Sequence, residues 1–260
     1  MVYTVKSTPM EGLSPAEIYM LCGAVDIEAL FGLEDKKTVF IKTKADVLKL
    51  KVNLQDKELL DPEGRLTKKG ALLIKALEIY SKSKTYARIN NLSIALSKSR
   101  KEDNVVILFE DEPEVSYRLE LWPRKRVISL LMDVYDFFRR PAKTRDFEYL
   151  IRDIDDRDLE RVKTMDLIGR SVINFEWFRR PGKRDEKIGY EHKLFFADGD
   201  KIVQLDAVHR DYAYISLFYL YKQVFDWLGI PYGREVLTDN EPQHQLSGNG
   251  RNPETAGGHH

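Results

Sequence analysis

The segment NVVILFEDEPEVSYRLELW, residues 104–122, contains the clearest fold signal in this chain of 260 residues. Residues 105–109 form a continuous apolar run, which is typical of a buried strand. After an acidic turn at 110–114, apolar and polar residues alternate from Val115 to Leu121. Because side chains of a strand point alternately to its two faces, this pattern predicts an antiparallel hairpin with one buried face.

The flanking sequence extends this hairpin into a meander. Residues 86–90 and 92–96 repeat the period of two and predict two further strands. After Pro123 the period changes to that of a helix, which Pro141 ends. The apolar residues expected on one side of this helix are Val127, Ile128, Leu131, Val134, Tyr135 and Phe138.

The N-terminal region predicts mainly helices. Ser14-Pro15-Ala16-Glu17 is a capping box with proline at the first helical position, so a helix is expected to begin there. We expect a short second helix between Asp26 and Gly32, a strand over 38–41 and a helix over 47–54. Asp61-Pro62-Glu63-Gly64 predicts a turn.

After this turn, Thr67 is expected to cap a helix with one apolar stripe, formed by Leu72, Leu73, Ala76, Leu77 and Tyr80.

The second half of the chain alternates between the same two patterns. Short helices are expected around 145–152 and 156–163, and a strand over 171–178. Asp198-Gly199 predicts a tight hairpin between strands 190–196 and 201–207. A long aromatic helix is expected at about 210–228, followed by Gly229 and Pro231, which end it.

A hairpin followed by a helix therefore occurs twice, at 104–138 and at 189–228. Either a duplication or ordinary alternation of strands and helices produces this order. We predict an α+β fold with antiparallel sheet portions in a quasi-two-fold, pseudo-duplicated arrangement, flanking helices and a C-terminal helical part. We expect one body over 1–233, with pseudo-halves of about 1–140 and 141–233, and a disordered polar tail over 234–260.

Composition narrows the function classes. The 42 Lys and Arg residues balance 42 Asp and Glu residues, so the summed positive potential of a general polyanion binder is absent. No apolar run approaches the ~20 residues that span a bilayer, and the first residues form no signal-peptide core. A single cysteine, Cys22, excludes an internal disulfide and suits a reducing compartment. We therefore expect a cytoplasmic protein without membrane insertion.

No reactive motif occurs with the spacing that its chemistry requires. The chain lacks a phosphate-binding P-loop, a dinucleotide fingerprint, a nucleophile elbow and a zinc-protease motif. Cys22 lies on the apolar face of a helix, where a buried inert thiol is expected. His192 and His209 have no second ligand at metal spacing, and the aspartates of 153–158 are interleaved with arginines. We expect no catalysis, no cofactor and no metal.

Basic and aromatic residues are the best candidates for partner binding. Basic residues cluster at 124–126, 139–145 and 179–184, where they either solvate loops and helix ends or orient a partner. The last helix carries more rings than one buried face requires, and tyrosine and tryptophan are enriched at binding hot spots. The candidate partner-binding residues are Phe175, Trp177, Arg179, Arg180, Tyr190, Phe195 and Tyr219.

The order of these segments resembles the EspG family, the cytosolic chaperones of type VII (ESX) secretion systems, and its Gram-positive relatives. Leu13-Ser14-Pro15-Ala16-Glu17 is similar to the opening helix of that family, and Leu60-Asp61-Pro62-Glu63-Gly64-Arg65-Leu66 to its segment before a later helix. The resemblance covers roughly residues 10–230 as a pattern. It implies a quasi-two-fold α+β fold without catalysis, which binds the apolar tip of a helical secreted effector, or its targeting domain, and keeps it soluble for export.

Two alternatives remain open at this point. Residues 13–80 also resemble a winged-helix DNA-binding regulator, with 45–56 as the candidate recognition helix. Its lysines are offset by Asp46 and Asp56, whereas phosphate contacts require a basic helix, so we expect no nucleic-acid partner. The other alternative is an enzyme whose site has no recognisable motif.

Overall fold

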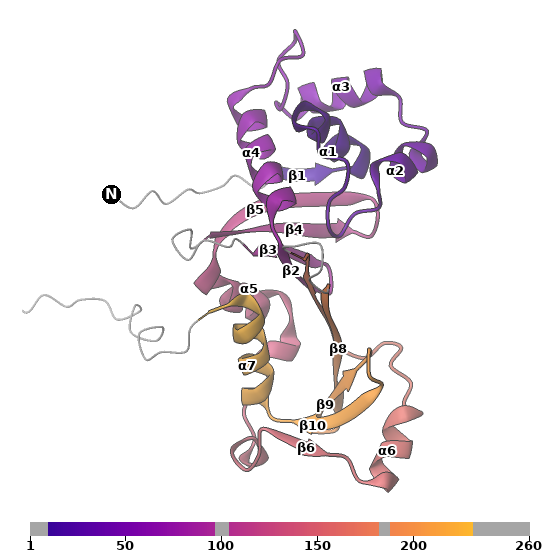
Figure 1. Cartoon of the computed structure of the whole chain (residues 1–260), viewed down its shortest axis with the longest axis vertical. Coiled ribbons are helices and arrows are strands. Elements are labelled where there is room, and N and C mark those ends of the chain that lie inside the picture. The colour runs from indigo at the N-terminus through magenta and orange to yellow at the C-terminus, as the bar shows by residue number, and fades with distance from the viewer. Residues whose placement is uncertain (1–9, 97–103, 182–187, 231–260) are drawn as a thin grey trace, which may run out of the picture. The chain divides into compact units, whose positions relative to one another are not determined.

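The computed structural model describes residues 10–96, 104–181 and 188–230, which form a mixed α+β fold around an antiparallel sheet (Figure 1). Within these residues the sheet has ten strands in the order β1-β5-β4-β3-β2-β7-β8-β9-β10-β6. The strands are β1 (Met10–Leu13), β2 (Thr85–Ile89), β3 (Leu92–Leu96), β4 (Asn104–Glu112), β5 (Ser116–Pro123), β6 (Ile151–Asp153), β7 (Val172–Arg179), β8 (Gly189–Asp198), β9 (Lys201–Asp206) and β10 (Asp211–Ile215).

The described α-helices are α1 (Pro15–Cys22), α2 (Lys36–Thr43), α3 (Val47–Asp56), α4 (Lys68–Lys82), α5 (Val127–Val134), α6 (Asp156–Lys163) and α7 (Leu217–Leu228). Short 3₁₀ helices occur at η1 (Gly23–Val25), η2 (Arg124–Arg126), η3 (Asp136–Arg139) and η4 (Thr144–Phe147). The predicted fold class is confirmed in its α+β character, its antiparallel sheet and its C-terminal helix. The pseudo-duplication stays a prediction, and the predicted tail over 234–260 lies outside the described residues.

The central meander forms as predicted, but its burial differs. Val106 pairs with Leu121 and Leu108 with Leu119 in the β4–β5 hairpin. All five residues of β3 are buried, as are residues 105–109 of β4. The buried strand predicted over 105–109 is therefore confirmed, whereas the prediction of one buried face is wrong for β3, because side chains pack against both of its faces.

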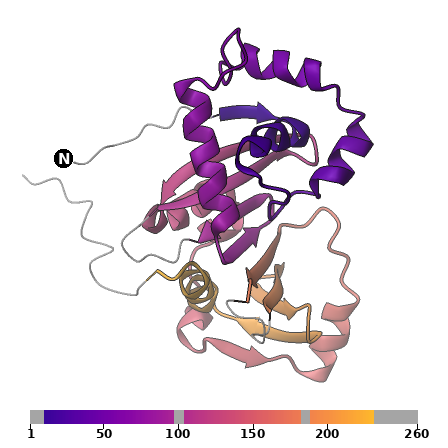
Figure 2. The same cartoon turned by 45° about the horizontal axis from the view of Figure 1, so that its top comes forward.

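Two large cores lie on opposite faces of the sheet. One contains α5 and α7 side chains packed against Ile94, Ile107, Phe175 and other strand residues. The other contains α1 and α4 side chains packed against Tyr86, Val106 and Leu108. Helix α4 crosses the strands of this second face (Figure 2). A third, smaller core lies under α6 and joins Val162 to Phe196, Val203 and Tyr214.

Local capping signals explain where several helices begin. The Ser14 hydroxyl accepts a hydrogen bond from the Glu17 N–H at 3.3 Å, and the Glu17 carboxylate accepts one from the Ser14 N–H at 2.7 Å. This is the predicted capping box. Thr67 caps α4 in the same way through the Gly70 N–H, at 3.1 Å. Leu72, which was predicted on the buried stripe of α4, is instead exposed.

Two predictions in the N-terminal region are wrong. Residues 26–32 form no helix, because Asp26 adopts a left-handed conformation with φ 53°. Residues 38–41 belong to α2 rather than to a strand, because Asp35 caps this helix by accepting from the Thr38 N–H at 3.0 Å. Helix α3 forms where it was predicted.

Two predictions in the second half are also corrected. The aromatic helix is shorter than predicted, because Asp211–Ile215 form β10, paired with β9 and β6. Ser216 then caps α7 by accepting from the Tyr219 N–H at 3.1 Å. Residues 145–152 are only partly helical, since Ile151 begins the edge strand β6. In the described part of the chain, no helix is both long and apolar enough to cross a membrane.

Candidate functional site

The predicted partner-binding residues divide between the core and two sheet faces. Phe175 and Phe195 are completely buried in the core under α7. The Phe175 ring centroid lies 3.9 Å from that of Trp227. Because the Phe175 and Phe195 rings do not reach the surface, they support the sheet and are unavailable to a partner in this structure.

Trp177 and Arg179 lie on the same face as this core. The Arg179 guanidinium stacks over the Trp177 ring, 5.8 Å from its centroid. The Trp177 ring crosses the backbone of Gly189, where a Cβ would lie 2.9 Å from it. The half-buried Tyr219 ring packs against this core from α7, and its burial raises the pKa of its hydroxyl.

Tyr190 lies on the opposite face, because it pairs with Phe178 in the β7–β8 ladder whereas Trp177 pairs with Glu191. The exposed Tyr190 donates a hydrogen bond to the Glu176 carboxylate at 3.3 Å. The Arg180 guanidinium lies 5.4 Å from the centroid of the Tyr86 ring. The predicted residues therefore form no single surface, although Trp177, Arg179, Arg180, Tyr190 and Tyr219 keep exposed atoms and remain predicted contacts.

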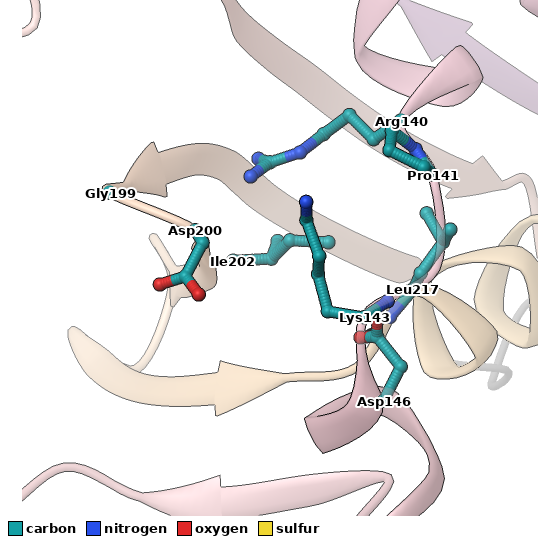
Figure 3. A pocket seen from close by; sticks show the side chains of 8 residues that line it. All are labelled: Arg140, Pro141, Lys143, Asp146, Gly199, Asp200, Ile202 and Leu217. Carbon is teal, nitrogen blue, oxygen red and sulfur yellow. Dashed lines mark hydrogen bonds between the residues drawn. The ribbon is translucent and has the colours of Figure 1, made fainter.

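A different corner of the fold combines a cavity with exposed charges and rings. A cavity of about 300 Å³ lies where the segment after η3 meets the β8–β9 turn and the start of α7 (Figure 3). We call it the Arg140 cleft; it is lined by Arg140, Pro141, Lys143, Asp146, Gly199, Asp200, Ile202 and Leu217.

Buried and partly buried hydrogen bonds fix the walls of the Arg140 cleft. Asp146 is 7% exposed, and its carboxylate accepts from the Lys143 N–H at 2.6 Å and the Leu217 N–H at 2.8 Å. The Tyr221 hydroxyl donates to the Phe138 carbonyl oxygen, and the Ser216 N–H donates to the Leu150 carbonyl oxygen at 3.0 Å. The segment 138–150 is therefore attached to α7 at three points.

Arg140 is the most unusual group in this cleft. Its guanidinium lies 5.3 Å from the centroid of the Phe137 ring. Its Nη1 atom is buried and has no hydrogen-bond partner among the described residues. Buried polar atoms without a partner are rare in folded proteins, so such an atom in a cavity is a candidate contact for a ligand. Figure 3 shows the guanidinium extending into the cavity toward the Lys143 ammonium group.

A second cavity of about 380 Å³ adjoins the first and shares Lys143 and Asp200 with it. Its other lining residues are Thr144, Glu148, Tyr149 and Arg152. The Arg152 guanidinium stacks over the Tyr149 ring at 5.0 Å from its centroid. Both cavities therefore present a cation held against an aromatic ring.

Exposed apolar side chains lie beside these cavities. The Phe147 and Phe218 rings meet edge to face, with centroids 5.1 Å apart. Phe147 is 74% exposed and Phe218 40%. Phe147 comes from η4 and Phe218 from α7, and we call these two rings the Phe147 patch. Exposed apolar groups gathered from several elements often mark interaction sites.

The sequence predicted only part of the Arg140 cleft and the Phe147 patch. The basic run at 139–145 was predicted either to solvate a loop or to orient a partner, and Phe218 belongs to the aromatic helix. Neither pattern predicts the cavity, because Gly199 and Leu217 reach it only through the fold of the sheet.

Two of the aspartates at 153–158, Asp155 and Asp158, serve a structural role. Asp155 caps α6 by accepting from the Asp158 N–H at 2.9 Å. Asp158 accepts from the Lys201 ammonium at 3.0 Å and the Tyr214 hydroxyl at 2.8 Å. These hydrogen bonds, together with one from Arg161, lower the pKa of the Asp158 carboxyl. Among the described residues, no three His, Cys, Asp or Glu side chains are placed to hold a metal ion.

The other titratable candidates lie away from the Arg140 cleft. Cys22 is buried, and this burial raises the pKa of its thiol to about 12. The His192 Nε2 lies 2.7 Å from the Asn174 Oδ1, and the His209 Nδ1 lies 3.1 Å from an Asp206 carboxylate oxygen. Neither histidine faces the Arg140 cleft.

Comparison with known proteins identifies the family of this chain. A family model described as Domain of unknown function (DUF5081) matches residues 7–236. No curated protein matches the chain.

Proposed function

The chain belongs to the family described as Domain of unknown function (DUF5081), and we propose that it is a non-catalytic adaptor for a helical protein client. In this proposal the protein binds the apolar face of a client helix in the cytoplasm and keeps it soluble before export. The client class follows from the resemblance to type VII secretion chaperones.

The observation that carries this proposal is the Phe147 patch. Phe147, at 74% exposed, leaves most of its ring in contact with water, although Phe218 lies beside it. Exposed apolar surface is costly in water, at roughly 25 cal/mol per Å², so a partner that covers these rings gains free energy. An amphipathic helix is suited to this role, because its apolar residues recur on one face.

Charged residues beside the Phe147 patch orient the client helix in this proposal. Arg152 and Lys143 line the neighbouring cavity together with the acidic Glu148 and Asp200. A mixed charged rim around an apolar centre is the usual arrangement of protein interfaces, in which the rim sets register rather than affinity.

No observation favours the DNA-binding alternative. Helix α3, the candidate recognition helix, exposes the apolar Leu48 and Val52 beside the basic Lys49, and its Leu50 and Leu54 face the core. A helix that reads DNA presents basic and polar side chains to phosphates and bases.

The proposal is tested by co-expressing the full chain with secreted helical proteins encoded beside it, followed by gel filtration. We expect one of them to co-elute with the wild-type chain. For that client, Phe147→Asp weakens binding at least about tenfold in calorimetric titration, because it places a charge in the centre of the interface. Since Phe147 is mostly exposed, this variant is expected to fold as the wild type does.

Leu48→Asp is the matched control, because Leu48 is also 74% exposed but lies on α3, which packs on the other large core. It should leave binding unchanged. A third variant, Arg179→Glu with Arg180→Glu, tests the contacts predicted at the last residue of β7 and the residue after it. The proposal fails if no helical client co-elutes, and the position of the surface is wrong if Phe147→Asp binds as tightly as Leu48→Asp.

A further inference from the structure

We infer that the Arg140 cleft is a binding site for an oxyanion, either a phosphate or a carboxylate group. The inference concerns the cavity itself, and it holds whether or not a protein client covers the Phe147 patch.

The first argument is the state of the Arg140 guanidinium. The Nη1 atom of Arg140 is buried without a hydrogen-bond partner among the described residues, and the group is held 5.3 Å from the centroid of the Phe137 ring. A guanidinium presents its N–H donors in a planar fork that matches the oxygens of a carboxylate or phosphate. Stacking on Phe137 restricts this fork before a ligand arrives, which reduces the entropy lost on binding.

The second argument is the convergence of two cations. Figure 3 shows the Lys143 ammonium group pointing into the cavity toward the Arg140 guanidinium. Two like charges that face each other in a partly enclosed space repel, and an anion between them converts this repulsion into two attractions. Hydrogen bonds between ionised groups are also shorter and stronger than those between neutral groups.

The two acidic residues of the cavity do not take the place of an anionic ligand between Arg140 and Lys143. The Asp146 carboxylate already accepts two backbone N–H groups, at 2.6 and 2.8 Å, and is almost fully buried. Asp200 lies on the opposite wall, and its carboxylate is turned away from the two cations in Figure 3. The remaining walls are apolar, formed by Pro141, Ile202 and Leu217, so a bound oxyanion is partly shielded from water.

The size of the cavity is sufficient for a small oxyanion. A volume of about 300 Å³ accommodates a phosphate group or a small organic acid. The ligand in this inference is therefore a free phosphate or a small carboxylic acid.

The test is a titration of the full wild-type chain with inorganic phosphate, and separately with succinate, at constant ionic strength kept with chloride. We expect saturable binding of at least one of the two, measured by calorimetry and by chemical shifts of residues around the cleft. The probe that binds more tightly identifies the ligand as phosphate-like or carboxylate-like.

Arg140→Gln is expected to weaken this binding at least about tenfold, and Lys143→Gln to weaken it by a smaller factor. Arg139→Gln is the matched control, because Arg139 is the neighbouring arginine but is exposed and paired with Asp136. If Arg140→Gln does not fold, Lys143→Gln still tests the inference, because Lys143 is exposed and its replacement is expected to leave the fold intact. The inference is overturned if neither probe saturates the wild-type chain, or if the Arg139 variant loses binding as the Arg140 or Lys143 variant does. The titration contains no client, so its failure is distinguishable from failure of the adaptor proposal.

Discussion

Replacing Gly70 by alanine tests the packing of α4 against the chain that precedes it. Gly70 is the third residue of α4, where helix propensity alone favours alanine by about 1 kcal/mol. A Cβ at this position would lie 2.2 Å from the carbonyl oxygen of Leu59 and 3.2 Å from a methyl carbon of Leu66. The Leu59 carbonyl cannot move freely, because it accepts the Thr67 N–H at 3.1 Å.

The expected sign is therefore opposite to that of helix propensity. Overpacking in a fixed site costs about 1–3 kcal/mol, and a backbone contact as short as 2.2 Å belongs at the upper end. After subtracting the propensity gain, we expect Gly70→Ala to lower the free energy of unfolding by about 2 kcal/mol. Urea unfolding followed by circular dichroism measures this loss as a lower midpoint at an unchanged slope.

Gly23→Ala is the matched control. Gly23 has a right-handed helical backbone, with φ −61° and ψ −23°, and a Cβ there meets no described atom within 4 Å. This variant should be as stable as the wild type or more stable, by up to about 1 kcal/mol. The reasoning is refuted if Gly70→Ala equals or exceeds the wild type in stability, or if both variants lose the same amount.

Three further predictions concern the core, the α6 network and the cleft. The buried Cys22 thiol, with its pKa raised to about 12, should react with a thiol reagent at pH 8 only after denaturation, and rapid labelling of the native protein would contradict this. The hydrogen-bond partners of Asp158 lower the pKa of its carboxyl in the folded protein, so the stability that they supply is complete above the unfolded-state pKa and is lost as the pH falls through the folded-state pKa. Asp158→Asn should therefore reduce the dependence of the free energy of unfolding on pH in the acid range. An unchanged dependence would reject this role of Asp158. Asp146→Ala leaves the Lys143 and Leu217 N–H groups without their acceptor, so we expect a loss of about 2 kcal/mol in chemical unfolding, with a smaller loss for Asp146→Asn.

The adaptor proposal and the oxyanion inference concern neighbouring parts of one corner. The segment 138–150 carries both Arg140 in the cleft and Phe147 in the patch, and Asp146 ties it to α7. Variants of Asp146 should therefore weaken both kinds of binding, whereas Phe147→Asp and Arg140→Gln should each affect only one.

Several cap and turn signals in this chain were readable from local sequence, whereas the Asp35 cap of α2 was missed. Ser14, Thr67 and Asp155 begin helices because each side chain accepts a hydrogen bond from an N–H three residues later. Asp198-Gly199 forms a tight turn between β8 and β9 because Gly199 adopts φ 61° without a Cβ penalty. These contacts lie within a few residues, so the sequence contains both partners.

The wrong predictions concern segments whose side chains are compatible with both a helix and a strand. Residues 38–41 are β-branched and aromatic, which is typical of strands. In the described part of the chain no strand pairs with them, and the Asp35 cap starts α2 at this place instead. Residues 211–215 continue the aromatic pattern of α7, but β6 and β9 pair with them and make them a strand. A local cap decided the first outcome, and pairing with other strands decided the second.

The sequence by itself determined the fold class, most element positions and the presence of charged and aromatic residues suited to binding. Only the tertiary structure decided which of them reach the surface. Phe175 and Phe195 became core because α7 covers their face, and Tyr190 turned to the other face because strand side chains alternate. The Arg140 cleft required residues from 140 to 217 to meet in space, and a contact of that range is set by packing of whole elements rather than by any local pattern.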